Sequence, residues 1–555
     1  MSQSKFKSNQ AIQLNTNILV TPRLLRKLEN GWSGHFNREV VPILIECEDM
    51  FAPLYSSKPN SRPSTPTYFV LGALVLKDLF GLTDEELEDR IAFSLDFQYA
   101  LGTVSLDHQP INQRTLNRFR AANSLYTRET GIDLIAQFMD KIADALKNKY
   151  LGTNRKRRMD SVMIDNGCRK LSRLQLAHVI NKNALFLLDE HQISIPDELY
   201  HYIEDFDENK VTYHSKQSAS DKLLNACQDA CAIRDLIPST LQDNEDVLLL
   251  KRFISEQVIL NPDGSFESVR DGKTLTSTTL NNPAEPDSTI RKKAGETHQG
   301  FVGNFAETVD TDTNRKFIDS ADFQPNIYSD SQFCKDEIQK MAEAGDTASL
   351  CVDGAYAGID NVNEAAQHGI KLIGTAMAGK ETPDLVADFV IDDDEQTVIC
   401  PNGKKADRAV YSEKTESYRV SYFKNTTCKG CPFAACGNCP FKEHKRVRSG
   451  NISRKMIQRA EIQRTIRSDE FEENYRFRNG VEAIPSQLRR NQKIDNLPYR
   501  GFLRKKMGYF LAITAINVRR ALRYAQEDAK KVLDYIFQLV FTGILVNFDL
   551  ISQSD

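Results

Sequence analysis

Two short apolar segments of this chain each carry an aspartate where a hydrophobic residue would be expected. Asp160 lies in the middle of residues 157–164, which alternate in polarity and are rich in Met, Val and Ile, and Asp353 ends the apolar run that begins at residue 348. Both patterns predict β-strands. A carboxylate in a buried strand is costly unless it is paired or binds a ligand. The two segments therefore predict a buried sheet in which each acid is either a ligand or half of an ion pair.

The segments around these two strands predict an α/β core. A hairpin pattern surrounds a polar turn at 310–314, and helical and strand patterns then alternate up to residue 376. This order is typical of a mixed sheet covered by helices. The predicted strands are 301–309, 316–323, 348–354 and 371–376, and the predicted helices between them are 331–344 and 361–368.

The remaining segments predict a domain division around this core. Residues 20–150 have helical periodicity, with a capping signal at Thr83 to Glu86 and arginines along 113–124 that either bind DNA or form a solvated face. We expect a helical N-terminal DNA-binding domain at 1–150, core segments at 151–167, 296–380 and 465–507, a mostly helical insertion at 168–295, a β-rich insertion with a cysteine cluster and basic segment at 381–464, and C-terminal helices at 508–555.

A third acid stands among arginines near the end of the core. Tyr475, Arg478 and Glu482 are spaced to share one face of a helix. Such a face can hold a divalent metal through the Glu and a phosphate through the Arg and Tyr. Gly480 and Pro485 flank Glu482 and predict a kink, because proline disfavours helical geometry in the residue before it.

Three carboxylates in this order suit two-metal catalysis at a phosphodiester. Mg²⁺ takes oxygen ligands, and two ions can activate the attacking oxygen and stabilise the leaving oxygen. One Asp would bridge both ions, while the other Asp and Glu482 would hold one each. Other acids compete for these positions or are structural: Asp165 is a rival for the first position, and Asp310, Asp312 and Asp319 are expected to be turn or surface acids. His298 binds phosphate or is a structural histidine.

A cysteine cluster precedes the basic segment. Cys428, Cys431, Cys436 and Cys439 form two Cys-x-x-Cys pairs, and Cys400 is a candidate fifth ligand. Paired thiolates of this kind favour a structural Zn²⁺. An iron–sulfur cluster, which also takes four thiolates, and four reduced thiols without metal are the alternatives.

Charge is distributed unevenly although the net charge is only −4. Residues 381–395 are acidic, residues 442–506 are basic, and Arg155 to Arg158 form a short basic run. Separated charges of this kind predict local partners. Within the basic segment, Arg446 and Arg448 are candidate contacts to the phosphate backbone of DNA. A solvated basic face is the alternative.

Taken together, these motifs resemble bacterial insertion-sequence transposases with an Asp-Asp-Glu triad and a ribonuclease-H-like core. The triad is Asp160, Asp353 and Glu482, and the spacing of Tyr475, Arg478, Glu482 and Arg489 is similar to the Tyr-Arg-Glu-Lys signature of one branch, with Arg489 in the Lys position. The run from Tyr499 to Gly501, residues 512–520 and the helical block at 66–122 also look like that branch.

The resemblance implies the activity, cofactors and partners. It implies a transposase that binds terminal inverted repeats, cleaves the element ends and joins their 3′-OH groups to target DNA, using two Mg²⁺ or Mn²⁺ ions. It also implies double-stranded DNA as partner and an assembly of at least two copies. A metal-dependent nuclease without strand transfer and a domesticated, non-catalytic DNA-binding protein are the competing functions.

No membrane partner is expected. The first residues lack the apolar stretch of a signal peptide. Residues 532–548 are apolar but carry Asp534 and Gln538, so they are interpreted as a buried helix and not as a membrane span. The expected location is cytoplasmic, associated with the nucleoid.

Overall fold

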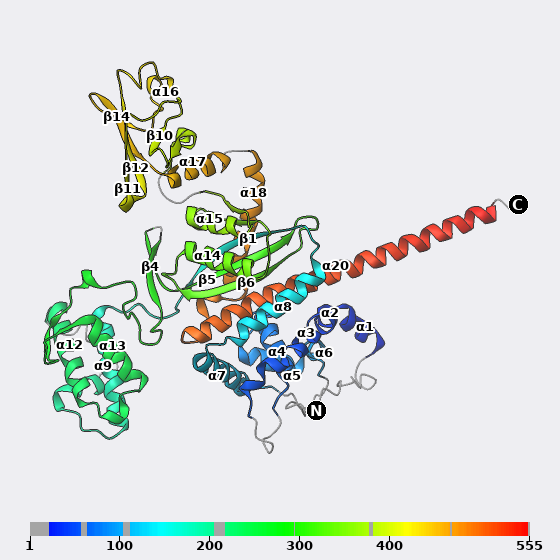
Figure 1. Ribbon diagram of the computed structural model, residues 1–555. Helices are drawn as coiled ribbons and strands as arrows, with labels where there is room; N and C mark the ends of the chain where they lie inside the picture. The colour runs from blue at the N-terminus through cyan, green and yellow to red at the C-terminus, as the bar shows by residue number, and fades with distance from the viewer. Residues whose placement is uncertain are drawn as a thin grey trace.

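The computed structural model describes residues 21–56, 64–103, 111–204, 217–293, 295–376, 381–466 and 469–552, and leaves the side chains of 469–470 and 535–552 undescribed. A mixed sheet lies at the centre of the chain (Figure 1). Helices from both ends of the sequence cover it, one helical unit extends from one side, and a β-rich unit extends from another. This arrangement confirms the predicted α/β class with added segments.

The central sheet has the order β6–β5–β1–β7–β8, with β4 also pairing with β5. The middle strand β1 runs antiparallel to β5 and parallel to β7, and β7 is parallel to β8. A mixed sheet of this kind is consistent with the ribonuclease-H-like core that the sequence predicts. The strands are β1 (Arg155–Asp165), β4 (Thr289–Lys293), β5 (Glu296–Asp310), β6 (Lys316–Pro325), β7 (Leu350–Val352) and β8 (Leu372–Gly374).

The two faces of the sheet pack against different helices because side chains alternate along each strand. Val162 and Ile164 of β1 join the core formed with the N- and C-terminal helices. Met159, on the other face of β1, packs in a smaller core with α14 (Asp330–Glu343) and α15 (Ile359–Gln367). Asp160 therefore shares its face with Val162 and Ile164.

The N-terminal helices share one hydrophobic core with the sheet and with the long helix α20 (Phe502–Ser552). The contact is close at Gly303 of β5, where an added Cβ would lie 2.5 Å from the ring of Tyr509 in α20. The predicted capping box is present at Thr83 and Glu86. The N-terminal helices are α1 (Pro22–Asn30), α2 (Trp32–Glu39), α3 (Val41–Glu46), α4 (Thr67–Phe80), α5 (Asp84–Phe93), α6 (Leu95–Leu101), α7 (Gln113–Thr130) and α8 (Leu134–Tyr150).

The segment between β1 and β4 forms a unit with its own hydrophobic core. It is mostly helical, as predicted, and also holds a short antiparallel hairpin. Strand β4 was not predicted: it lies at the end of the expected insertion but belongs to the central sheet. The elements of this unit are α9 (Arg173–Glu190), α10 (His201–Glu204), α12 (Ala219–Leu236), α13 (Glu245–Gln257), β2 (Val258–Leu260) and β3 (Phe266–Val269).

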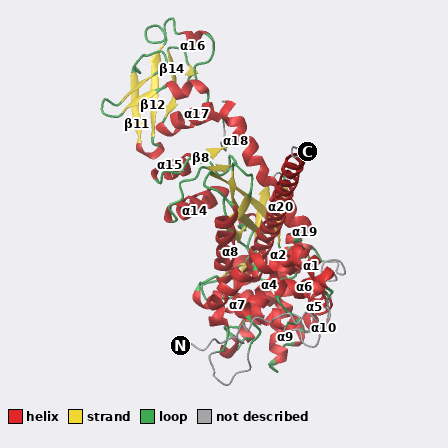
Figure 2. Cartoon of the chain, turned by 90° about the vertical axis from the view of Figure 1, so that its right-hand side faces the viewer, coloured by secondary structure: helices red, strands yellow, loops and turns green. Residues whose placement is uncertain are grey.

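The β-rich unit stands apart from the sheet and is connected to it through α17 and α18 (Figure 2). Its four-stranded sheet has the order β11–β12–β14–β13 and packs on a separate core. The short strands expected over 384–425 are thus confirmed. Its elements are β9 (Val390–Asp392), β10 (Thr397–Ile399), β11 (Arg408–Ser412), β12 (Ser417–Phe423), α16 (Pro432–Ala435), β13 (Lys442–Glu443), β14 (Val447–Ile452) and α17 (Arg454–Ile466).

The final helix continues beyond the core it helps to form (Figure 1). Its buried stretch reaches Ala525, whereas Val532 and Leu533 are mostly exposed. The interpretation of 532–548 as a buried helix is therefore wrong at its start, and its side chains beyond Asp534 lie outside the described residues. No helix in the described part of the chain is long and apolar enough to cross a membrane.

Candidate active site

Asp160 and Asp353 stand side by side on neighbouring parallel strands. In the ladder between β1 and β7, Arg158 pairs with Cys351. Continuing this register by two residues places Asp160 opposite Asp353, at the carboxyl end of β7. Neighbouring strands lie about 4.8 Å apart, so the two predicted acids are brought to one edge of the sheet.

The carboxylate of Asp160 is largely buried and has two hydrogen-bonding neighbours. Its side chain is 17% exposed. The backbone N–H of Ser161 donates to it over 2.8 Å, and Nη2 of Arg478 lies 3.2 Å away. Burial raises the pKa of Asp160 above its usual value; Arg478 opposes this, while Asp353 and Glu482 add to it through charge repulsion. The three predicted acids are therefore close enough to influence one another.

The chain bends where it brings Glu482 to this edge. Helix α18 (Asp469–Asn479) ends one residue before Gly480, a single 3₁₀ turn covers Gly480–Glu482, and α19 (Ala483–Asn491) follows. The kink predicted around Glu482 is thus present. Nη1 of Arg478 donates to Glu482 over 2.8 Å across the bend, while the Glu482 side chain is 60% exposed. Tyr475 is also exposed, and its ring lies near Phe471.

Gly480 permits the close approach of a buried arginine that sequence analysis had not singled out as structural. A Cβ at this position would lie 2.1 Å from Nη1 of Arg158. Arg158 donates to the Phe477 carbonyl over 2.6 Å and to Glu307 over 2.7 Å. Arg520 of α20 also pairs with Glu307 at 2.8 Å. These bonds fix the end of α18 to β1 and β5.

The short basic run was misinterpreted as a surface patch. Arg157 and Arg158 are both buried. Arg157 pairs with Glu337 at 2.7 Å, Asp346 at 2.9 Å and Asp319 at 3.2 Å. Both side chains point into the protein because they lie in the central strand of the sheet. They therefore anchor this strand and present no charge to a partner.

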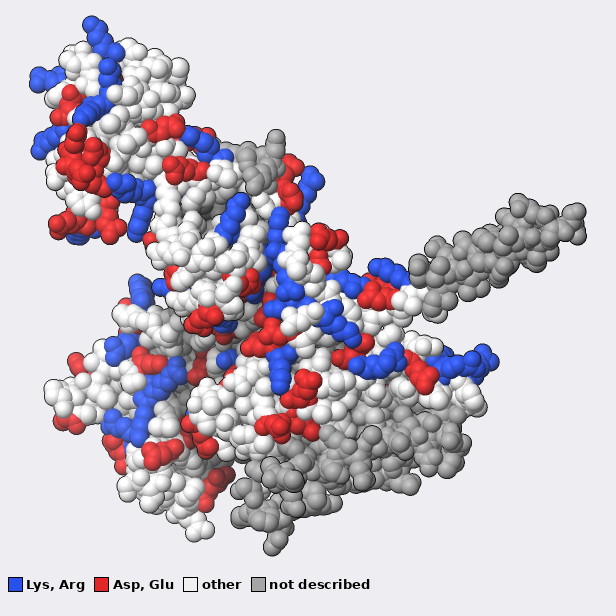
Figure 3. All heavy atoms as spheres, turned by 45° about the vertical axis from the view of Figure 1, so that its right-hand side comes forward, with Lys and Arg blue, Asp and Glu red and all other residues white. Residues whose placement is uncertain are grey.

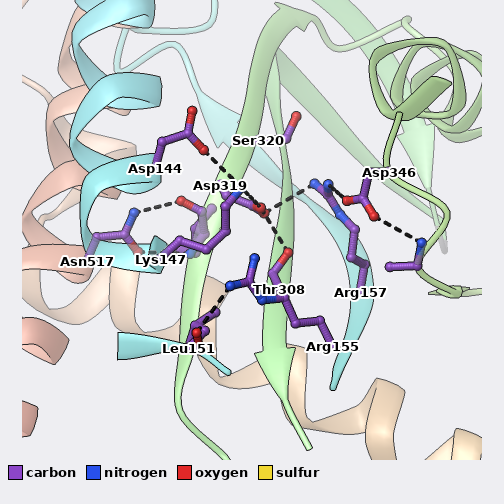
Figure 4. Close-up of polar contacts among 12 residues, drawn as sticks. Asp144, Lys147, Leu151, Arg155, Arg157, Thr308, Asp319, Ser320, Asp346 and Asn517 are labelled. Carbon is purple, nitrogen blue, oxygen red and sulfur yellow. Dashed lines mark hydrogen bonds and ion pairs between the residues drawn. The ribbon is translucent and has the colours of Figure 1, made fainter. Parts of the chain in front are cut away.

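The acids of the hairpin make structural contacts, but Asp319 is neither a turn acid nor a surface acid, because it lies in β6 with a side chain that is 1% exposed. Asp319 accepts hydrogen bonds from Lys147 and Thr308, both at 2.9 Å, and pairs with Arg157 (Figure 4). Asp310 accepts from the backbone N–H groups of Gly152 and Asp312 at 2.8 and 2.9 Å.

Asp165 is the last residue of β1, and Arg489 of α19 contacts the same end of this strand. Asp165 accepts from the backbone of Gly167 at 2.8 Å, as in a turn after a strand. Arg489 pairs with Asp495 at 3.1 Å and donates to the Met163 carbonyl at 3.2 Å. Together with His298, these residues border a hollow at the end of β1. Arg489 is therefore held at this hollow, and a phosphate-binding role for it stays a prediction.

The three carboxylates are chemically suited to bind divalent cations, but their positions in the fold keep the three carboxylates apart. Carboxylate oxygens are the ligands that Mg²⁺ prefers. Within the described ranges, no three His, Cys, Asp or Glu side chains are arranged to hold a metal ion. Arg478 occupies the space between Asp160 and Glu482. Metal binding here would require the exposed side chain of Glu482 to turn from Arg478 toward the two aspartates.

Four of the five candidate cysteines lie around one small cavity. Cys400, Cys428, Cys431 and Cys439 border one small cavity of about 30 Å³, whereas Cys436 is exposed and lies outside it. Burial raises the pKa of the Cys428 thiol, and Cys431, Cys439 and Cys400 add to the effect. In the part of the chain that the structure covers, these thiols are not arranged to hold a metal. Zinc therefore stays a prediction.

The acidic and basic segments meet within the β-rich unit and do not form separate patches. Figure 3 shows both charges interspersed on this unit. Arg464 pairs with Asp388 at 2.9 Å, and Arg454 donates to Asp393 at 2.9 Å. Arg448 pairs with Glu443, whereas Arg446 is exposed. Much of the basic segment is therefore neutralised internally, and Arg446 is the more accessible of the two predicted DNA contacts.

Two stretches of the chain match models of known protein families. Residues 399–522 match a family described as a transposase DDE domain, which supports a nucleic-acid-cleaving enzyme in general. Residues 28–122 match a family described as a transposase domain (DUF772), and both matches together support a DNA transposase. No curated protein and no solved structure matches the chain.

The matched ranges include one of the three acids of the candidate site. Glu482, Arg478 and the cysteines lie within residues 399–522, whereas Asp160 and Asp353 lie outside both ranges. The match also begins in the β-rich unit, next to Cys400. This unit and the C-terminal half of the site therefore belong to one recognised stretch of sequence.

Proposed function

We propose that this chain is an insertion-sequence transposase that binds the terminal inverted repeats, cleaves the element ends and joins their 3′-OH groups to target DNA. The observation that carries the proposal is the register of β1 and β7, which places Asp160 opposite Asp353, with Arg478 linking Asp160 to Glu482. Asp160 and Asp353, from separate parts of the chain, thus share one edge of the sheet, and Arg478 connects Asp160 to Glu482. The family matches give independent support.

In this proposal Asp160, Asp353 and Glu482 hold two Mg²⁺ or Mn²⁺ ions. Such ions, when bound, activate the attacking oxygen and stabilise the leaving oxygen of an in-line displacement. Arg478 orients Glu482 and offsets repulsion among the acids, because its guanidinium contacts two of them. Tyr475, exposed on the same helix, and Arg489, at the end of β1, position the phosphate backbone on either side.

The finer identity and partners follow from the same site. The Tyr475, Arg478, Glu482 and Arg489 spacing supports the Tyr-Arg-Glu-Lys branch. Two element ends must be cut together, so we propose an assembly of at least two copies on double-stranded DNA, associated with the nucleoid.

In the β-rich unit, the thiols around the small cavity hold a structural Zn²⁺, and Arg446 and Arg448 contact phosphate.

The proposal is tested with duplexes taken from the ends of the element that encodes the chain. Matched inverted repeats bracketing the gene supply these sequences. The full chain with Mg²⁺ is expected to cleave them and to give joined products with a target duplex. Asp353→Asn should abolish both steps, because it removes a metal ligand. Asp312→Asn is the matched control: this exposed acid lies in the β5–β6 turn, and its side chain accepts a hydrogen bond from Asn154 over 3.0 Å.

Each other outcome identifies a different function. Cleavage without joined product identifies a metal-dependent nuclease. Specific binding without either reaction identifies a non-catalytic DNA-binding protein. Full cleavage and joining by Asp353→Asn would show that the catalytic assignment is wrong.

A further inference from the structure

Three exposed arginines meet in one groove next to the N-terminal helices. Arg114 and Arg118 extend from α7, and Arg504 stands in the first turn of α20. With Arg120 and Arg500 they line a groove of about 630 Å³. Arg114, Arg118 and Arg504 make no ion pair or side-chain hydrogen bond with any residue that the structure describes. Their charges are therefore available to a partner.

Among the described residues that line this groove, the one acid is already neutralised. Both oxygens of Asp84 accept hydrogen bonds from Arg120, at 2.6 and 2.7 Å, and Lys77 lies 3.2 Å away. Burial opposes ionisation of Asp84, but Arg120 and Lys77 outweigh it and lower the pKa of this carboxyl. Asp84 thus stays ionised and fixed, and the three exposed arginines give the groove an excess of positive charge.

The groove continues in two directions that matter for a long ligand. A second groove shares Arg500 and Arg504 with the first and runs on past Arg128 and Arg252. In the other direction, Arg500 donates to the carbonyl of Asn166, the residue that follows β1, over 3.4 Å. Asp160 lies six residues earlier on this strand, which corresponds to about 20 Å at the rise of a β-strand.

We propose that this groove binds the phosphate backbone of double-stranded DNA away from the phosphate that is cleaved. Arg500, which lines the groove, contacts Asn166 at the end of β1, about 20 Å along the strand from Asp160, so the groove meets the duplex at a distance from the cleavage point. Flexible, unpaired arginines on two different elements suit a contact that holds the backbone without reading its sequence. The inference rests on the proposed function, which supplies the DNA and the position of the cleaved phosphate.

The test measures how duplex binding depends on salt. The variant Arg114→Gln/Arg118→Gln/Arg504→Gln removes only exposed, unpaired charges, so it should fold normally. Each lost phosphate contact lowers the slope of log K against log salt by about 0.9, so the triple variant should lose about 2 to 3 in slope. Its affinity at low salt should fall about 10- to 100-fold, equally for specific and unrelated duplexes. Ethylation interference along the duplex should find phosphates, away from the cleavage point, whose modification weakens binding by the wild type and leaves this variant unaffected.

A matched variant controls for net charge. Arg408→Gln/Lys414→Gln/Arg419→Gln also removes three exposed charges, from the β11–β12 hairpin of the β-rich unit. An equal loss of slope in both variants, or no loss in the groove variant, overturns the groove as a DNA site. Asp353→Asn should bind with the wild-type slope. A wild-type chain that binds no duplex would instead overturn the proposed function itself, so the two failures are distinguishable.

Discussion

The guanidinium of Arg478 lies 3.2 Å from the carboxylate of Asp160, and the same group donates to Glu482 over 2.8 Å. One cation thus joins an acid of the central strand to an acid beyond the bend of the chain. A guanidinium in this position competes with metal for both carboxylates, and it also keeps Glu482 directed toward the sheet edge.

Replacing Arg478 by Gln should separate these two effects. Without the guanidinium, we expect half-maximal cleavage at a lower Mg²⁺ concentration, because metal no longer competes with a fixed cation. The maximal rate should fall about 10- to 100-fold, as for other groups that orient metal ligands. Cleavage measured across a Mg²⁺ series checks both. Arg489→Gln is the control, since Arg489 pairs with Asp495, and its Mg²⁺ dependence should be unchanged. An unaltered Mg²⁺ dependence in Arg478→Gln would contradict the competition.

Gly480→Ala should destabilise the protein although alanine favours helices. The new Cβ would lie 2.1 Å from the buried Arg158, which is held by Glu307 and cannot retreat without losing that pair. Crowding of this kind costs about 1–3 kcal/mol, measurable as a lower free energy of unfolding in urea. Gly358→Ala is the control: its nearest neighbour is Ser331 at 3.8 Å, so its effect should stay within about 0.5 kcal/mol. Equal stability of both variants would mean that Arg158 moves freely.

Asp78 should make the protein less stable as the pH rises from about 4 to about 6. Burial raises the pKa of this carboxyl to about 6, despite Lys77 and Arg120. The unfolded chain then releases the proton at lower pH than the folded one, so ionisation favours unfolding across this range. Asp78→Asn mimics the protonated form and should gain about 1–3 kcal/mol over the wild type above pH 6, with little difference near pH 4.

The neighbouring Asp84 should have the opposite effect on how the stability of the protein changes with pH. Its pKa is lowered by Arg120 and Lys77 against the effect of burial. Asp84→Asn should therefore lose stability relative to the wild type near neutral pH, and the loss should shrink as the pH falls through the acidic range. Urea unfolding at a series of pH values measures both variants. Parallel pH curves for the two variants would show that these carboxyls are not perturbed as described.

Cysteine variants should distinguish the two possible sets of metal ligands. If the purified chain contains zinc, Cys400→Ser should lower its zinc content, because Cys400 borders the cavity with the other thiols. Cys436→Ser should retain the metal, because Cys436 is exposed outside that cavity. Elemental analysis of the two proteins decides between them. Zinc lost from Cys436→Ser and kept in Cys400→Ser would restore the set favoured by the two Cys-x-x-Cys pairs.

The acids of the candidate site could be predicted because each leaves a local signal. Asp160 and Asp353 interrupt apolar strand patterns, and Glu482 stands among arginines. Their meeting could not be derived from local pattern, since the pairing of β1 with β7 joins residues almost 200 positions apart. The sequence therefore indicated which residues to compare, and the register of the strands determined that two of them are neighbours.

The sequence predictions failed where the burial of a residue, and not its type, determines its role. Arg157 and Arg158 look like a basic patch, but the central position of β1 buries both and gives them acid partners. Strand β4 was missed because its short, charged sequence, Thr289–Lys293, becomes a strand only by pairing with β5.

The core shared by the N-terminal helices and α20 has a consequence for synthesis of the chain. Helices α1 to α8 leave the ribosome about 350 residues before α20, whose residues complete their core. At 5–20 residues per second, that interval lasts roughly 20 to 70 s. During this time the apolar faces of the first helices lack their final partner. We therefore expect premature termination before α20 to leave an aggregation-prone fragment, and a truncated copy of the gene not to yield a folded N-terminal domain.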